Sequence, residues 1–178
     1  MAGHNKWAQI KHKKAITDSK KSKIFSKLAR YISVEAKLSG GKDSPGLRAA
    51  IEKARKVNMT NDVIERAIKK ANEPSVNMES ITYEAYGPGG AGIMIETLND
   101  SKNRTVQDIK HILAKNGFEL GGIGSVAWSF QKEKTPEGLI WKPNMFVPLS
   151  DIDLELLDKL VEEIEELDDV QDVYTNAE

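Results

Sequence analysis

The spacing at which apolar residues recur along this chain changes once, near residues 72–75. This change constrains the fold more than any other feature of the sequence. Before it, apolar residues recur at helical spacing in three stretches. After it, short apolar runs bounded by Gly and Pro are interleaved with two further helical patterns. We therefore expect an α+β protein with two domains, residues 1–75 and 76–178. The length of 178 residues is enough for one or two domains with a proper core.

Three amphipathic helices are expected after an extended basic arm formed by residues 1–17. Each helix has a single apolar face, which predicts that the three pack as a small bundle. Capping and breaking residues mark the ends: a start near Asp18 and a stop at Gly40-Gly41, a start at Ser44-Pro45 with Ser44 as N-cap and a stop at Asn58, and a start at Thr60.

Residues 76–178 are expected to form a small α+β sandwich, with two helices on one face of a mostly antiparallel sheet. The segment Gly87–Gly92 is as glycine-rich as a phosphate-binding loop, but a strand-like run follows it where such a loop would open a helix. A hairpin turn is therefore expected there. The expected elements are strands 81–86 and 92–98, a helix 100–115, strands 123–130 and 139–141, a helix 151–167 and a strand 170–174.

The charge of the chain divides at the same place as its hydrophobic period. Residues 1–75 contain 18 Lys and Arg against 7 Asp and Glu, whereas residues 76–178 contain 8 against 20. The net charge of -1 hides this division. Such a polarised chain suggests a polyanionic partner for its basic part.

Lysines are concentrated near the N-terminus, where eight of them lie within residues 6–27 and only Asp18 opposes them. Like charges held so close destabilise a fold unless a polyanion relieves the repulsion. RNA, DNA and an acidic protein all qualify, and the acidic second half is itself a candidate neighbour. Trp7 either stacks on a base or packs against the bundle. The candidate nucleic-acid-binding residues are Lys6, Trp7, Lys11, His12, Lys13, Lys14, Lys20, Lys21, Lys23, Arg48, Lys53, Arg55, Lys56, Lys69 and Lys70.

No convergent set of catalytic groups is visible in the sequence, so we expect no enzyme activity, no cofactor and no metal. The absence of Cys excludes disulfides, Cys-ligated zinc and thiol catalysis, and it suits a reducing compartment. His111 is interpreted as a surface or packing residue. The acidic run Glu162–Asp169 alternates with apolar residues and lacks the spacing of a calcium loop, so it predicts a solvated helix face.

No apolar run approaches the length of a membrane span, and the N-terminus carries no apolar signal core. We expect a cytoplasmic protein with no membrane partner and no small-molecule substrate. The sequence carries no indication of its oligomeric state.

Several motifs, spread in order over nearly the whole chain, resemble the YebC/PmpR family. They are Gly3-His4-Asn5-Lys6-Trp7, Ile10-Lys11-His12-Lys13-Lys14, Leu47-Arg48-Ala49-Ala50-Ile51, Asn58-Met59 through Lys70, Tyr83 through Gly90, Asn103-Arg104-Thr105, Gly124-Ser125-Val126 and Val170 through Tyr174.

This resemblance implies an N-terminal helical domain and an α+β domain that is interrupted by a further α+β domain. Here only residues 131–150 separate Trp128-Ser129-Phe130 from the last helix, so the inserted domain is expected to be missing. The resemblance also implies a function. Family members are described as DNA-binding transcriptional regulators, and some relatives act in translation at the ribosome.

The leading hypothesis is a nucleic-acid-binding regulator of gene expression, specifically a DNA-binding transcriptional regulatory protein that contacts phosphate backbone. The alternative is a ribosome-associated translation factor that binds rRNA. A third reading, an adaptor for another protein, depends on the acidic helix expected over 151–167. No recognition helix with a base code is visible, which favours contacts that do not depend on sequence.

Overall fold

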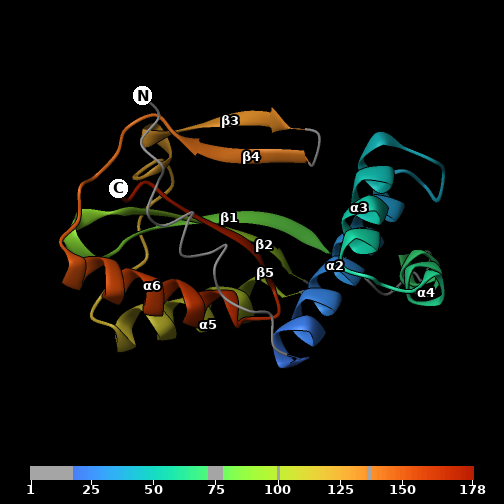
Figure 1. The fold of residues 1–178 in the computed structure, drawn as a ribbon, viewed down its shortest axis with the longest axis horizontal. Helices are drawn as coiled ribbons and strands as arrows, with labels where there is room; N and C mark the ends of the chain where they lie inside the picture. Colours follow the sequence, from blue (N-terminus) through green and yellow to red (C-terminus); the bar gives the residue numbers. More distant parts are fainter. Residues whose placement is uncertain (1–17, 72–77, 100, 136–137) are drawn as a thin grey trace.

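The structure is a computed structural model, and it describes residues 18–71, 78–99, 101–135 and 138–178. A helical bundle is followed by a layered α+β unit (Figure 1). In this unit two helices lie on one face of a central sheet, and a separate β-hairpin lies over the other face. The expected α+β class, with helices packed together ahead of an antiparallel sheet, is confirmed.

The bundle is built around α2 (Asp18–Leu38), against which both α3 (Pro45–Lys56) and α4 (Asn61–Ala71) pack. Ile32 and Ala36 of α2 are fully buried, and the core is rich in alanine. Small side chains let the helix axes approach closely. Ser33 Oγ uses this approach to donate a 2.7 Å hydrogen bond to the carbonyl of Ala67 in α4.

The helix ends follow the signals in the sequence. Ser44 is the N-cap of α3, and its side chain accepts a 3.1 Å hydrogen bond from the backbone N–H of Leu47. Asn58, just after α3, has a φ of 62°, in the left-handed region that Asn tolerates better than most residues.

The central sheet has the strand order β1-β2-β5 and is antiparallel throughout. Strands β1 (Glu79–Tyr86) and β2 (Gly92–Asn99) form a hairpin around the short 3-10 helix η1 (Pro88–Gly90). Strand β5 (Val170–Thr175) returns from the far end of the chain to lie beside β2. The Gly-rich segment is therefore a hairpin turn, as predicted.

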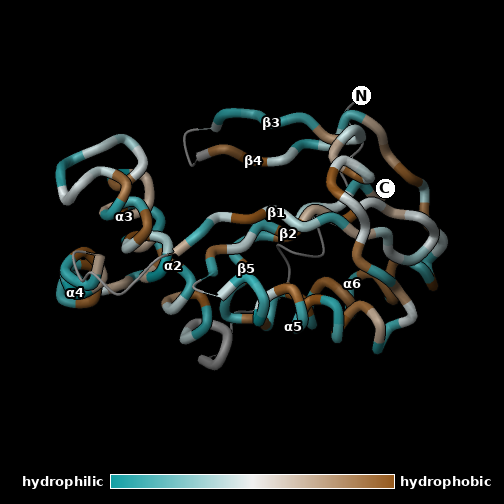
Figure 2. The backbone as a smooth tube through the Cα atoms, turned by 180° about the vertical axis from the view of Figure 1, so that it is seen from behind, coloured by the Kyte–Doolittle hydropathy of each residue, from teal (hydrophilic) through white to brown (hydrophobic). Residues whose placement is uncertain are grey.

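Helices α5 (Lys102–Lys115) and α6 (Asp151–Glu165) cover one face of this sheet (Figure 1). Ile93 and Ile95 of β2 are fully buried against Leu157, Leu160 and Ile164 of α6. Hydrophobic and hydrophilic positions alternate along both helices (Figure 2). Because side chains alternate along a strand, the neighbours of Ile93 and Ile95 point to the opposite face, beneath the hairpin.

The strand expected over residues 123–130 is wrong. Residues 123–126 form a turn, and Ala127–Ser129 is a 3-10 helix (η2). Strand β3 (Phe130–Thr135) begins only at Phe130 and pairs with β4 (Gly138–Pro143). The physical cause is the buried carboxylate of Glu84, which accepts hydrogen bonds of 2.7–2.8 Å from the backbone N–H groups of Gly124, Val126 and Ala127. Because these backbone N–H groups are bonded to Glu84, they cannot form the hydrogen bonds of a β-ladder with a neighbouring strand.

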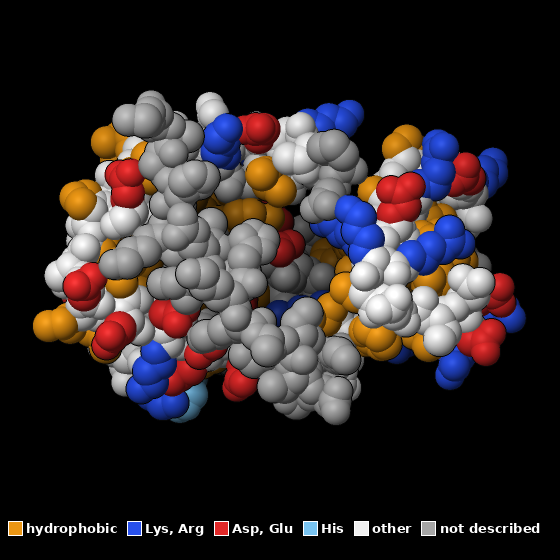
Figure 3. Space-filling model, in the orientation of Figure 1, with side chains coloured by type: hydrophobic (Ala, Val, Ile, Leu, Met, Phe, Trp, Pro, Cys, Tyr) orange, Lys and Arg blue, Asp and Glu red, His pale blue; other side chains and the backbone are white. Residues whose placement is uncertain are grey.

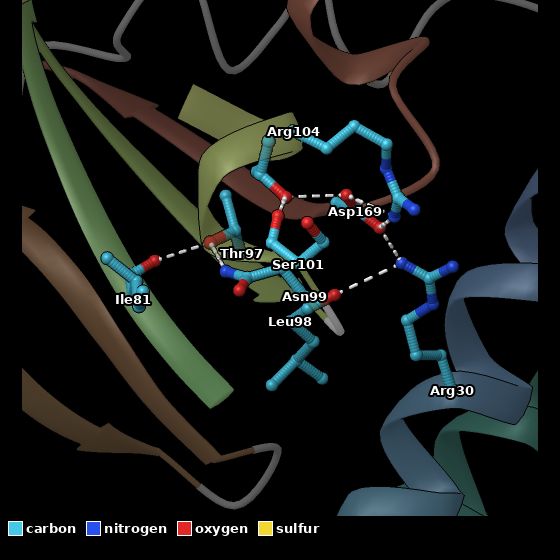
Figure 4. A network of polar contacts seen from close by, with 9 residues as sticks. Arg30, Ile81, Thr97, Leu98, Asn99, Ser101, Arg104 and Asp169 are labelled. Carbon is cyan, nitrogen blue, oxygen red and sulfur yellow. Dashed lines mark hydrogen bonds and ion pairs between the residues drawn. The ribbon is translucent and has the colours of Figure 1, made fainter. Parts of the chain in front are cut away.

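Asp169 holds the bundle and the α+β unit together (Figure 4). Its side chain, only 7% exposed, forms an ion pair and hydrogen bond with Arg30 of α2. It also accepts hydrogen bonds from Arg104 at 3.0 Å and from Thr105 at 2.6 Å, both in α5. Burial alone would raise the pKa of Asp169, but these donors outweigh it, so the pKa lies below its usual value.

Replacing Asp169 with Ala should lower the free energy of unfolding by about 3 kcal/mol, because two arginines and a hydroxyl lose a buried acceptor. Urea denaturation measures this loss. Asp168→Ala, at the exposed neighbouring position, is the matched control and should change stability by less than about 0.5 kcal/mol. Equal effects of the two substitutions would contradict the role given to Asp169.

Acid should weaken the fold through Glu84. Burial raises the pKa of this carboxyl. Its three backbone hydrogen bonds together lower the pKa by more than burial raises it, so the net pKa lies below the ordinary 4.5. The stabilisation is fully present above the ordinary pKa and is lost as the pH falls through the depressed folded-state pKa. We therefore expect the free energy of unfolding, measured by urea denaturation, to fall less between about pH 7 and about pH 3 for Glu84→Gln than for the wild type.

Candidate nucleic-acid interface

The structure places only part of the predicted basic surface. Lys6, Trp7, Lys11, His12, Lys13 and Lys14 lie outside the described residues. Lys20 and Lys21 belong to the first turn of α2. The other seven candidates lie in described parts of α2, α3 and α4.

Basic residues of α2 face the acidic corner between α6 and β5. Lys23 Nζ lies 3.5 Å from Glu166 Oε1 in an exposed ion pair, and Lys27 Nζ donates to the carbonyl of Glu165. Arg30 continues the same helix face to Asp169. Lys23, predicted as a phosphate contact, thus has an acidic neighbour from the second half of the chain.

The candidate cations of α3 and α4 divide between two surfaces. Arg48, Arg55, Lys69 and Lys70 are exposed on the outside of the bundle, where Arg48 Nε lies 3.3 Å from Asp43 Oδ1. Lys53 and Lys56 instead line a cavity between the bundle and the sheet. Figure 3 shows Lys and Arg side chains gathered over the bundle and at the rim of this hollow.

We call this cavity the central cleft. Its volume is about 430 Å³, and three parts of the chain line it. Lys27, Tyr31, Lys53 and Lys56 come from the bundle. The sheet contributes Glu96, Leu98, Gln171 and Asp172, and Leu139 of the β3–β4 hairpin contributes from above.

Two carboxylates face each other on the floor of the central cleft. Glu96 of β2 and Asp172 of β5 are direct cross-strand partners in the antiparallel ladder. Like charges in this position repel each other. Burial raises the pKa of Glu96; the hydrogen bond from Trp141 opposes this shift and the Asp172 charge adds to it.

The hairpin fixes the orientation of Glu96. Trp141 Nε1 in β4 donates a 2.9 Å hydrogen bond to Glu96 Oε1. Lys132 Nζ in β3 lies 4.7 Å from the centroid of the Trp141 ring, a cation–π contact that holds the indole from the other side. On the bundle side, Lys53 Nζ lies 5.6 Å from the ring of Tyr31.

Two tyrosines lie next to the carboxylate pair. Burial is the main cause that raises the pKa of Tyr31 and Tyr174. The charge of Glu35 is the next cause for Tyr31, and the charges of Asp172 and Glu96 add to the shift of both.

Gln171 adds an unusual donor. Its side-chain nitrogen Nε2 is buried and has no hydrogen-bond partner among the described residues. Buried polar groups are normally bonded, so such an atom needs an explanation.

Glu96, Asp172, Trp141 and Gln171 were not among the predicted site residues. One signal could have identified Glu96, since it is the single acidic residue within the apolar run of β2. Its pairing with Asp172, 76 positions away, depends on the register of the sheet. His111 is exposed on α5, as expected for a surface residue.

Two other properties concern only the part of the chain that is described. It contains no cluster of three or more His, Cys, Asp or Glu side chains suited to a metal ion. None of its helices combines the length and apolarity needed to cross a membrane.

Comparison with known proteins decides the family. Residues 5–74 match the TACO1/YebC protein N-terminal domain, and residues 78–137 and 132–177 match the TACO1/YebC second and third domain. The chain belongs to the TACO1/YebC family. The resemblance identified from the sequence motifs is therefore confirmed.

Relatives in the TACO1/YebC family carry the name "Probable transcriptional regulatory protein". The one from Fervidobacterium nodosum is 48% identical over 96% of this chain and 68% of its own length. That from Chromohalobacter salexigens is 49% identical over 78% of this chain and 59% of its own length. The relative from Thermosipho africanus aligns with all of this chain over 237 positions at 38% identity.

A solved structure of the conserved hypothetical protein Aq1575 from Aquifex aeolicus has the same fold. It superposes with a TM-score of 0.85 and 32% sequence identity, and the match covers 97% of this chain and 96% of Aq1575.

Removing one charge of the carboxylate pair should stabilise this TACO1/YebC chain. Asp172→Asn keeps the shape of the side chain and ends the repulsion with Glu96, so the free energy of unfolding should rise by about 0.5 kcal/mol at neutral pH. Urea denaturation measures the change. Glu119→Gln, at an exposed loop position, removes the same charge without a cross-strand partner and should have no measurable effect.

Proposed function

We propose that this chain is a nucleic-acid-binding regulator of gene expression that holds the phosphate backbone through its basic helical part. The observation that carries the proposal is the excess of cations in residues 1–75, 18 against 7 acidic side chains. The names of the relatives, transcriptional regulatory proteins, support this function. We take DNA in the cytoplasm as the first candidate target.

The exposed cations of the bundle suit backbone contact. Arg55, Lys69 and Lys70 are exposed, and Lys53 and Lys56 open into the central cleft. Lysine and arginine bind phosphate oxygens whatever the base, so this surface supports binding that depends little on sequence.

The ion pairs of Lys23 and Arg48 are compatible with this role. All four partners are well exposed, with side-chain exposures of 42% and 69% in the Lys23–Glu166 pair. Exposed pairs of this kind contribute little to stability. A phosphate can replace the carboxylate with little loss to the fold.

Ribosomal RNA is the alternative target, because the same cations would bind it equally well. Sedimentation of a cell lysate distinguishes between DNA and ribosomal RNA as the target. Co-migration with ribosomal subunits that resists DNase would favour a ribosome-associated translation factor, whereas recovery with DNA alone would favour a transcriptional regulator.

We further propose that the chain has two domains, residues 1–75 and 76–178, and lacks an inserted domain near residues 131–150. The Thermosipho africanus alignment spans 237 positions, so that relative carries additional residues within the aligned span of this 178-residue chain. The two matches to the second and third domain overlap at residues 132–137, which begin within β3. Activities of longer relatives that need the insertion are not expected here.

Phosphate contact predicts a steep salt dependence. With about six to ten contacts, affinity for duplex DNA should fall roughly 10³–10⁵-fold between about 50 mM and 200 mM salt. The double variant Lys69→Gln/Lys70→Gln should weaken binding to all sequences alike and reduce the slope of log affinity against log salt by about 0.9 per lysine. Fluorescence anisotropy measures both.

The matched control is Lys102→Gln/Lys110→Gln, which removes the same charge from exposed positions of α5. This variant should bind as the wild type does. A flat salt response, or an equal loss in the control, would rule out phosphate binding by the bundle.

A further inference from the structure

Residues without charge gather at one end of the α+β unit. Four segments contain no Asp, Glu, Lys or Arg: residues 85–95, 120–131, 143–150 and 173–177. Charged residues make up 30% of the whole chain, so these four segments stand apart from the rest of it. We call the surface that they form together the uncharged end.

Hydrogen bonds join the four segments to one another. Tyr86 of the first segment donates to the carbonyl of Ser125 in the second. The backbone N–H of Val147 in the third donates to the carbonyl of Asn176 in the fourth at 2.8 Å. Asn176 Oδ1 in turn accepts a 2.7 Å hydrogen bond from the backbone N–H of Gly92 in the first. In Figure 1 the starts of β3 and α6 and the C-terminus mark this end, and the bundle lies at the opposite end of the longest axis.

Large apolar side chains are exposed at the uncharged end. Ile123 is fully exposed, and Trp128 is 59% exposed. Tyr86, Met145 and Phe146 are exposed as well. Single exposed apolar residues are normal on a protein surface, whereas a group of them marks an interaction site.

Hydrogen bonds also fix the backbone and the rings of this surface. The buried carboxylate of Glu84 holds the segment around Ile123 through three backbone N–H groups. Trp128 Nε1 donates a 2.8 Å hydrogen bond to the carbonyl of Ser125, which also accepts from Tyr86. A surface that is already ordered loses little conformational entropy on binding, so more of its contact energy appears as affinity.

The chemistry of the uncharged end suits a protein and not a polyanion. None of its four segments holds a Lys or Arg that could contact phosphate. Trp, Tyr, Phe and Met are enriched in protein–protein interfaces, and the centres of such interfaces are depleted of charge.

The lack of charge also favours a second copy of the same chain as the partner. In a two-fold interface the same surface of each copy meets the other, so a charged surface would meet its own sign. Residues 76–178 carry 20 acidic against 8 basic side chains, and copies that met through the acidic surfaces would repel each other. At the uncharged end this repulsion is absent.

We propose that the uncharged end is a self-association surface through which two copies of this chain form a two-fold symmetric dimer. Ile123, Trp128 and Met145 supply its apolar contacts. The two basic bundles then lie at the far ends of the dimer, because each bundle is at the opposite end of its chain (Figure 1). The proposal goes beyond the proposed function and does not depend on it.

Sedimentation velocity of the full chain over a series of concentrations tests the proposal. The wild type should form a dimer as the concentration rises. Ile123→Glu and Met145→Glu each place a carboxylate in the interface from both copies, so each should raise the dissociation constant of the dimer at least about tenfold. Both positions are exposed, which leaves the fold of the chain unchanged.

Leu38→Glu is the matched control, because it makes the same kind of change at an exposed apolar residue in the bundle, at the end of α2. This variant should form dimers as the wild type does. Thermal melting of each variant shows that it is folded.

Salt distinguishes this dimer from head-to-tail association between the basic bundle of one copy and the acidic part of another. Contacts without charge are not screened, so the dimer should persist between about 50 mM and 500 mM salt. Dissociation over this range would overturn the proposal, because it indicates pairing of opposite charges.

Three other results would also overturn the proposal. The first is a monomer at every concentration up to about 1 mM. The second is a dimer that survives either Ile123→Glu or Met145→Glu, and the third is a dimer that Leu38→Glu weakens equally. None of these variants removes a cation, so the binding of nucleic acid is tested separately.

Discussion

The contact between Arg30 and Asp169 is the interaction on which the arrangement of this protein depends. Arg30 comes from the longest helix of the bundle, and Asp169 precedes the last strand of the sheet. The same arginine donates to the carbonyl of Leu98 in β2. One side chain is thus bonded to β2 and to the residue that precedes β5, and these two strands line the sheet side of the central cleft.

Acidic residues of the second half have two different roles, and burial separates them. Glu84 and Asp169 are buried carboxylates with a full set of donors; burial opposes their charge, but the donors outweigh it and lower the pKa. Glu96 is half-buried with one donor, Trp141, and a like-charged neighbour, and its pKa is raised. The first two hold the fold together. The third has too few donors to offset its burial.

Much of the fold could be predicted from the sequence because local signals agree with the tertiary contacts. Ser44 caps α3, Asn58 follows its end, and the Gly87–Gly92 segment turns between two strands. The failure at residues 123–130 has a distinct cause. The apolar residues there suggested a strand, but the carboxylate of Glu84, 40 positions earlier, binds the backbone N–H groups of the segment. No local pattern reports a partner at that distance.

The sequence by itself determined the class of fold, the family and the position of the basic charge, because period, caps and composition are properties of neighbouring residues. Only the tertiary structure decided where those charged side chains lie and which groups they contact. It placed Lys23 against Glu166, turned Lys53 and Lys56 into the central cleft and left Lys69 and Lys70 on the outside. It also paired Glu96 with Asp172 through the register of β2 and β5. Strand register and helix packing depend on contacts between distant segments, and these contacts exist only in the folded chain.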